Sequence, residues 1–301
     1  MSQTYSKINE IPSGSASGNL IEACLVLEGG AFRGLYTQGY LDAMMRNNLN
    51  FSCVIGVSAG ALGGLNYVSG QIGRSARINL SYRHDSRYVG VKALIHSHSF
   101  LDVGFLTEDR GIIDEPLDTE RLSRPEQRFV AVATNCLNGK PTCFEKGKCG
   151  DHLMEGVRAS ATMPYISPMV TINGTPYLDG GCSCAIPYRW AMKQGYKKII
   201  VIRTRDPLFR KKEARLSPAR RIYGKFPALA ATLSRSDRRY NRQCEEVELL
   251  HKCGRLLRLA PSKPVNVGRV EPDLEKLGEL YWLGYHDCLA HLDGIIRYLS
   301  K

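Results

Sequence analysis

The chain has 301 residues, of which 43% are hydrophobic and 23% are charged, and its formal net charge is +12. This composition can bury a substantial core, and it excludes disorder, collagen and a coiled coil as the main state. The ten cysteines are diluted over a long chain, and the N-terminus lacks the apolar core of a signal peptide, so we expect reduced thiols in a cytoplasmic protein.

Residues 1–20 are polar and interrupted by proline and glycine, which indicates a flexible N-terminal arm. Two short apolar runs, at 23–27 and 51–56, have the pattern of buried parallel strands, and each leads through a glycine turn into a segment with helical spacing. The uncharged stretch 47–73 is long enough to cross a bilayer, but its Gly, Ser and Asn residues favour a strand followed by a buried helix. This alternation is typical of an open α/β sheet covered on both faces.

The same alternation continues toward the C-terminus. Strand-like runs occur at 128–135, 142–147, 197–204 and 254–262. Helical patterns occur at 152–164, at 186–196 and at 274–299, the last as one or two helices. Residues 169–181 indicate a hairpin, with Asn173-Gly174 as its turn.

A G-V-S-A-G motif at residues 56–60 lies between a predicted strand and a predicted helix. A nucleophilic serine on such a sharp turn has a strained backbone, and its neighbours two residues away must be small so that the turn can close. The helix that follows directs its N-terminal dipole at the site, which favours developing negative charge. Ser58 is therefore a candidate nucleophile.

The segment E-G-G-A-F-R-G at residues 28–34 also lies between a predicted strand and helix. Turns of this kind present bare backbone N–H groups to anions. A dinucleotide site is the weaker interpretation, because Ala31 breaks the G-x-G-x-x-G spacing and no acidic residue clearly ends a second strand. An oxyanion hole that serves Ser58, with Arg33 adding positive potential, fits better.

Asp179 precedes two glycines, Gly180 and Gly181. An aspartate in this position is usually a turn residue. A serine nucleophile needs a base, however, and a carboxylate on a loop after a strand could approach Ser58. Both interpretations of Asp179 stay open on its local sequence.

In their order and spacing, the motifs at 28–34 and 56–60, R-A-S-A-T-M-P-Y-I-S-P at 158–168 and L-D-G-G at 178–181 resemble bacterial patatin-like phospholipases and acyl hydrolases. The resemblance covers roughly residues 23–205, and the joint occurrence is far more specific than any single motif. It implies a three-layer α/β/α fold with a mostly parallel central sheet. It also implies hydrolysis of acyl esters of lipids by a Ser-Asp dyad.

Carried onto this chain, the resemblance makes Ser58 the nucleophile and Asp179 the base. The oxyanion hole would be formed by the backbone amides of Gly29, Gly30 and Ala31, with Arg33 beside them. The remaining motif glycines are Gly34, Gly56, Gly60, Gly180 and Gly181. Ala31 replaces the third glycine of the family, and alanine would be strained there if the position requires a left-handed backbone.

Three segments are expected. Residues 1–20 form the arm, 21–206 form the catalytic domain, and 207–301 form a basic, mainly helical extension that packs on that domain or continues it. Two further functions remain open for such a protein: a soluble carboxylesterase or thioesterase with the same dyad, and a catalytically silent lipid-binding regulatory protein.

Neither a metal nor a cofactor is expected. His96 and His98 lie on one side of a predicted strand without partners at ligand spacing. Cys182 and Cys184 lack the C-x-x-C spacing of a redox or metal site and are better explained as small packing residues.

Histidine offers an alternative triad. His251, His286 and His291 all follow Ser58, as the histidine does in α/β-hydrolases. Nothing in their sequence surroundings distinguishes one of them, and each is better explained as a surface or packing residue of a helix.

The stretch Arg203–Arg242 holds thirteen Lys or Arg and three Asp or Glu, a balance of +10 out of the total +12. One interpretation is a solvated helical face. The other is an electrostatic patch for anionic phospholipid headgroups, which would bring a cytoplasmic protein to the inner face of the membrane. Nucleic acid is not expected, because no binding motif accompanies the charge.

The segment Tyr88–Leu117 mixes aromatic and aliphatic residues with glycines. It either covers an acyl-chain groove near Ser58 or fills an edge of the core.

Overall fold

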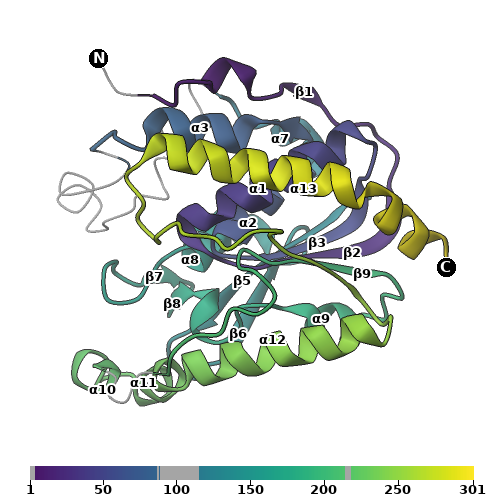
Figure 1. The fold of residues 1–301 in the computed structure, drawn as a ribbon. Helices are drawn as coiled ribbons and strands as arrows, with labels where there is room; N and C mark the ends of the chain where they lie inside the picture. Colours follow the sequence, from purple (N-terminus) through teal and green to yellow (C-terminus); the bar gives the residue numbers. More distant parts are fainter. Residues whose placement is uncertain (1–3, 87, 89–114, 214–217) are drawn as a thin grey trace.

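The computed structural model describes residues 4–86, 88, 115–213 and 218–301. Within these ranges, eight strands form one mixed sheet in the order β10-β9-β2-β3-β5-β8-β7, with β6 paired to β5 (Figure 1). The strands are β2 (Ile21–Leu27), β3 (Phe51–Val57), β5 (Arg128–Asn135), β6 (Pro141–Glu145), β7 (Val170–Ile172), β8 (Thr175–Asp179), β9 (Ile199–Ile202) and β10 (Leu257–Leu259). The strands from β10 to β5 are parallel, whereas β6, β7 and β8 pair antiparallel.

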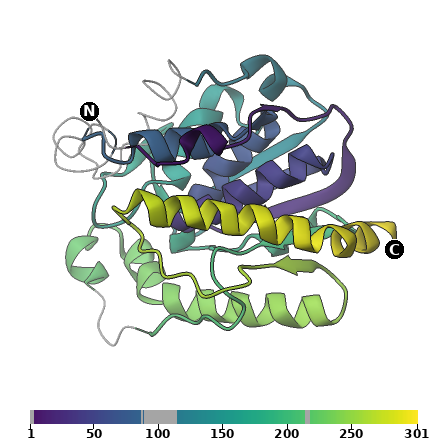
Figure 2. The same ribbon diagram turned by 45° about the horizontal axis from the view of Figure 1, so that its top comes forward.

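Helices cover both faces of this sheet. They are α1 (Gly34–Arg46), α2 (Ala59–Val68), α3 (Arg74–Tyr82), α7 (Thr119–Ser123), α8 (Leu153–Ser160), α9 (Tyr188–Lys193), α10 (Ala219–Ile222), α11 (Pro227–Ser234), α12 (Ser236–Lys252) and α13 (Leu274–Ser300). Both views show α13 lying along α1, with α12 on the opposite side of the sheet (Figures 1 and 2). The predicted three-layer α/β/α architecture with a largely parallel sheet is confirmed.

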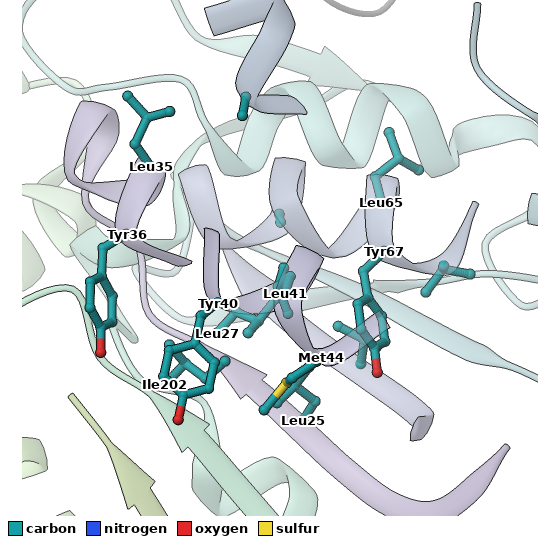
Figure 3. Packing of buried hydrophobic residues seen from close by; sticks show 14 of the residues in the cluster. Leu25, Leu27, Leu35, Tyr36, Tyr40, Leu41, Met44, Leu65, Tyr67 and Ile202 are labelled. Carbon is teal, nitrogen blue, oxygen red and sulfur yellow. The ribbon is translucent and has the colours of Figure 1, made fainter. Parts of the chain in front are cut away.

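The central strands are apolar throughout because successive side chains point to opposite faces of the sheet and both faces are covered. Leu25 and Leu27 of β2 belong to the core beneath α1, α2 and α13, whereas Cys24 and Val26 face the second core beneath α9 and α12. Figure 3 shows side chains of α1, among them Tyr40, packed over this first face of the sheet. The parallel strands are therefore buried on both faces.

The predicted hairpin is confirmed as β7 and β8, and its turn residues Asn173 and Gly174 have φ angles of 49° and 73°. The stretch of bilayer length at 47–73 folds as β3 followed by α2, as predicted. The C-terminal pattern forms the single helix α13. Among the helices of the described ranges, none combines the length and apolar character needed to span a membrane.

Residues 4–20, which we expect to form a loose arm, pack against the rest of the chain in the structure. Tyr5 and Ile11 are buried, and β1 (Gly14–Ser15) pairs antiparallel with β4 (Gln71–Ile72). A Cβ at Gly278 would lie 2.2 Å from the Tyr5 ring, so the ring lies directly on α13. The polar composition of the segment conceals the few apolar residues that make these long-range contacts.

Helices α1 and α13 approach each other through glycines. A Cβ at Gly39 of α1 would lie 2.0 Å from the Tyr281 carbonyl oxygen, and one at Gly284 of α13 would lie 1.9 Å from the Tyr36 carbonyl oxygen. The Tyr281 hydroxyl donates to the buried Asp42 carboxylate at 2.9 Å. The C-terminal helix is thus an integral part of the layer that carries α1.

We expect Gly284→Ala to lower the free energy of unfolding by about 3 kcal/mol, because the added methyl group forces two packed backbones apart. Gly294→Ala is the matched control in the same helix, where nothing lies within 4 Å of the added atom. That control should raise stability by up to about 1 kcal/mol through helix propensity. Urea unfolding of both variants measures the difference, and equal effects would contradict the close approach.

Candidate active site

Ser58 occupies the turn between β3 and α2 with φ 55° and ψ −125°, a backbone conformation that is strained for any residue except glycine. The flanking glycines make this turn possible. A Cβ at Gly56 would lie 2.3 Å from the Gly60 carbonyl oxygen, and one at Gly60 would lie 2.6 Å from the Leu27 carbonyl oxygen. The serine hydroxyl is therefore held at the carboxyl end of the parallel strands.

Asp179 ends β8, and strand pairing brings it to the level of Ser58. Val57 is paired with Val132 of β5, and the next residue of β5, Ala133, is paired with Asp179. A Cβ at Gly180 would lie 2.1 Å from the Val132 carbonyl oxygen, so the position that follows Asp179 needs a glycine. Two residues far apart in the sequence thus face one another across a single strand.

Asp179 lies close enough to Ser58 for the serine hydroxyl to affect the pKa of the Asp179 carboxyl. Burial raises the pKa of the Asp179 carboxyl above its ordinary value, and a hydrogen bond from the Ser58 hydroxyl opposes that rise. The Gly181 N–H also donates to Asp179 Oδ1, at 2.7 Å, and fixes the carboxylate. Asp179 therefore has the turn geometry expected for it and lies beside the strand end that carries Ser58.

The glycine loop adjoins the serine turn. A Cβ at Gly29 would lie 2.9 Å from the Ser58 Cβ, and one at Gly34 would lie 2.7 Å from the Ala59 Cβ. The backbone N–H groups of Gly29, Gly30 and Ala31 have no hydrogen-bond acceptor among the described residues. The loop therefore presents unpaired donors beside the Ser58 side chain.

Ala31 has a φ angle of 50°, so the position that holds glycine in the family does require a left-handed backbone. Alanine is therefore strained at this position, as expected for a residue that replaces the third glycine of the motif. Gly30 has an extended backbone with φ −174°, and its missing side chain leaves room for Thr204, whose Oγ1 would lie 2.7 Å from an added Cβ.

Arg33 lies beside the loop without a side-chain hydrogen bond among the described residues, and its buried Nε atom has no partner. Burial lowers the pKa of its guanidinium to about 10, and the positive charges of Arg205 and Arg269 add to this effect. Positive potential is therefore concentrated next to the candidate oxyanion hole.

Ser160 is a site residue that the sequence did not identify. Its buried Oγ accepts the Ser58 backbone N–H at 2.9 Å and donates to the Val132 carbonyl oxygen at 2.6 Å. This bridge fixes the backbone of the serine turn to β5. The R-A-S-A-T-M-P motif contained the signal, but the motif alone does not indicate what its serine contacts.

A pocket with an empty volume of about 450 Å³, its mouth included, opens at Ser58. Its lining is mainly apolar, and consists of Ala31, Phe32, Leu35, Gln38, Ser58, Ala59, Leu62, Asn79, Tyr88, Ala161 and Met163. Within the described ranges, Tyr88 is the one lining residue from the predicted groove segment Tyr88–Leu117. Residues 89–114 of that segment, which include His96 and His98, lie outside the described ranges.

The three histidines of the alternative triad make other contacts. His291 shares a hydrogen bond of 3.1 Å with the Tyr40 hydroxyl, and His286 stacks on Trp282. His251 faces the backbone N–H of Arg258. In the described part of the chain, none of them contacts Ser58 or Asp179.

The first cation of the basic stretch Arg203–Arg242 is not exposed, in contrast to both interpretations of the stretch. Arg203 is fully buried, where it lies 3.7 Å from the Glu28 carboxylate and donates to the Tyr240 hydroxyl at 3.2 Å. It cannot contact a membrane. The rest of the stretch includes seven exposed cations: Lys212, Arg220, Arg221, Lys225, Arg235, Arg238 and Arg242.

A model of the family described as patatin-like phospholipase matches residues 25–192, more than half of the chain. The chain therefore belongs to the patatin-like phospholipase family. A second model, described as a domain of unknown function (DUF6363), matches residues 226–300.

The uncharacterized protein YjjU of Escherichia coli (strain K12) is 32% identical over 184 residues, which are 60% of this chain and 51% of that protein. The chain thus spans about half the length of this curated relative. Among solved structures, VipD from Legionella pneumophila matches at 16% identity and a TM-score of 0.42, over 94% of this chain and 68% of VipD. The type III effector protein ExoU matches at 13% identity and a TM-score of 0.39, over 93% of this chain and 54% of ExoU.

Proposed function

We propose that this protein is a serine acyl hydrolase that cleaves acyl esters of lipids, phospholipids included. The observation that carries the proposal is the placement of Ser58 and the buried Asp179 at neighbouring strand ends, beside a loop with unpaired N–H donors. In this proposal Ser58 is the nucleophile, Asp179 is the base and the glycine loop is the oxyanion site, all at one end of the sheet.

In the acylation step, Asp179 accepts the Ser58 proton as the serine oxygen attacks the ester carbonyl carbon. The carbonyl oxygen becomes an oxyanion, which the N–H groups of Gly29, Gly30 and Ala31 stabilise. The tetrahedral intermediate then collapses, and the leaving alkoxide takes the proton from Asp179. In the second step, Asp179 accepts a proton from water, the resulting hydroxide attacks the acyl-serine, and Ser58 recovers its proton as the fatty acid leaves.

A carboxylate can act as base without histidine because burial makes it more basic. The raised pKa of Asp179 is the direction that this role requires. The mainly apolar pocket at Ser58 supports an acyl chain as the group that is bound.

We also propose peripheral contact with anionic membranes through the exposed part of the basic stretch. Ile222, the last residue of α10, is 54% exposed next to Arg221, and Leu208 is 87% exposed earlier in the stretch. Exposed aliphatic groups among cations suit a surface that is both apolar and negatively charged. Each Lys or Arg near such a surface contributes about 1 kcal/mol.

The test presents an ester in three forms: long-chain phospholipid in anionic vesicles, the same lipid in neutral vesicles, and a monomeric p-nitrophenyl ester. We expect fatty acid release from the vesicles, faster from the anionic ones, with the difference shrinking as salt is added. Turnover of the monomeric ester alone would instead support the soluble esterase or thioesterase. No turnover of any form, together with failure of active-site titration, would support a silent lipid-binding protein.

A further inference from the structure

Thr204, which follows β9, contacts the glycine loop through both its backbone and its side chain. Its N–H donates to the Glu28 carboxylate at 2.7 Å, and its hydroxyl donates to the Gly29 carbonyl oxygen at 3.2 Å. A Cβ at Gly30 would lie 2.7 Å from Thr204 Oγ1. Three consecutive residues of the loop therefore lie against one buried threonine.

The hydrogen bond to the Gly29 carbonyl also determines the direction of the Gly30 N–H. The two groups belong to one trans peptide unit, which is planar, so the C=O and N–H bonds point in opposite directions. Because Thr204 holds the carbonyl on its own side of the loop, the Gly30 N–H points away from Thr204. That N–H has no acceptor among the described residues, which leaves it available to an oxyanion.

The peptide unit between Gly29 and Gly30 needs such a restraint. Glycine lacks a Cβ and adopts backbone conformations that other residues do not, so a peptide unit between two glycines can rotate at low cost. In the part of the chain that the structure describes, the Thr204 hydroxyl is the one hydrogen-bond donor to the Gly29 carbonyl. An oxyanion donor stabilises the transition state most when its direction is fixed in advance.

Thr204 is itself held in place by its neighbour Arg203. The fully buried Arg203 side chain lies 3.7 Å from the Glu28 carboxylate that accepts the Thr204 N–H. Its guanidinium also donates to the Tyr240 hydroxyl at 3.2 Å and to Cys244 Sγ at 3.1 Å, both on α12. Direct contacts therefore connect the glycine loop through β9 to the C-terminal part of the chain.

We propose that Thr204 is a positioning residue that orients the Gly30 N–H as an oxyanion donor. The proposal rests on the proposed function and adds a residue to that site. Thr204 lies outside residues 25–192, which match the phospholipase family model, whereas Ser58 and Asp179 lie within them. Loss of the Thr204 hydroxyl should let the Gly29–Gly30 peptide rotate, which weakens stabilisation of the oxyanion and leaves binding of the ester unchanged.

The test compares a p-nitrophenyl ester with its thionoester, in which sulfur replaces the carbonyl oxygen. Sulfur accepts hydrogen bonds weakly, so the thionoester gains less from the oxyanion donors. Thr204→Val removes the hydroxyl and keeps a side chain of similar size. We expect it to lower kcat for the ester by about tenfold, with KM unchanged within about twofold, and to lower the ratio of kcat for the ester to kcat for the thionoester.

Thr37→Val is the matched control, because Thr37 of α1 is also buried and its hydroxyl has no hydrogen-bond partner within the described ranges. This variant should keep both kcat and the ratio. Thr204→Ser retains the hydroxyl and should recover most of kcat. Thermal unfolding identifies any variant that fails to fold. If Thr204→Val fails, Thr204→Ala supplies the comparison, because it removes the hydroxyl without placing a methyl group against the Gly29 carbonyl.

An unchanged kcat in Thr204→Val, or an equal loss on the ester and the thionoester, would overturn the proposal. Crystal structures of the unmodified protein and of Thr204→Val test it separately from turnover. A Gly29–Gly30 peptide that rotates in the variant would support the positioning role even if the unmodified protein hydrolysed neither substrate, a result that would refute the proposed function alone. A peptide that keeps its orientation in the variant would overturn the positioning role.

Discussion

Ser58→Ala is expected to abolish hydrolysis of p-nitrophenyl esters, with kcat/KM reduced by at least about 10³-fold, and to abolish labelling by a fluorophosphonate. The reason is that the substitution removes the attacking oxygen and leaves only binding and the oxyanion hole to assist water. Because the Ser58 side chain is small and its backbone position is set by Gly56, Gly60 and Ser160, the variant should fold normally.

Ser123→Ala removes a hydroxyl from an exposed serine of α7 and serves as control, with activity and labelling retained. Full activity in Ser58→Ala would remove this serine from the mechanism. Persistent fluorophosphonate labelling would place the nucleophile at another residue.

Asp179→Asn should lower kcat by about 10³- to 10⁴-fold, by analogy with losses in catalytic triads. The amide has the shape of the carboxylate, and its oxygen can still accept the Gly181 N–H, but it cannot take the Ser58 proton. Asp151→Asn, a change of an exposed aspartate, is the control. The measurement is steady-state hydrolysis of the same p-nitrophenyl ester.

The role of Asp179 as the base also predicts the direction in which activity changes with pH. Asp179 acts as base only when ionised, so activity is present above its pKa and is lost as the pH falls through that value. Since burial raises this pKa, the acidic limb should lie above the ordinary range of an aspartate. The limb should disappear from the residual activity of Asp179→Asn. An unchanged acidic limb in that variant would indicate a different base, such as a histidine.

The strands were predictable because their signals are local. Buried parallel strands such as β2, β3 and β9 are continuous apolar runs, and the Asn173-Gly174 turn specifies its hairpin through its left-handed residues. Residues 4–20 show the limit of local signals. Tyr5 acquires its burial from α13, which no pattern within the first twenty residues could indicate.

Only part of the candidate site could be inferred from local sequence. The turn around Ser58 follows from its flanking glycines, but the position of Asp179 depends on β5 lying between β3 and β8. Only the resemblance of the motifs to a known family indicated that Asp179 would act together with Ser58. Ser160 and Thr204 were not identified, because the register of β5 and the pairing of β9 with β2 determine their surroundings.

The sheet order has a practical consequence for handling this protein. Residues 25–192, the part that the phospholipase family model recognises, stop short of β9, which lies between β2 and β10. A fragment cut there would lack an interior strand, and it would leave bare the flank of α1 that α13 covers. The boundary of the residues that match the family model thus falls within one hydrophobic core. Expression vectors, chimaeras and truncation series should preserve the region from β9 through α13.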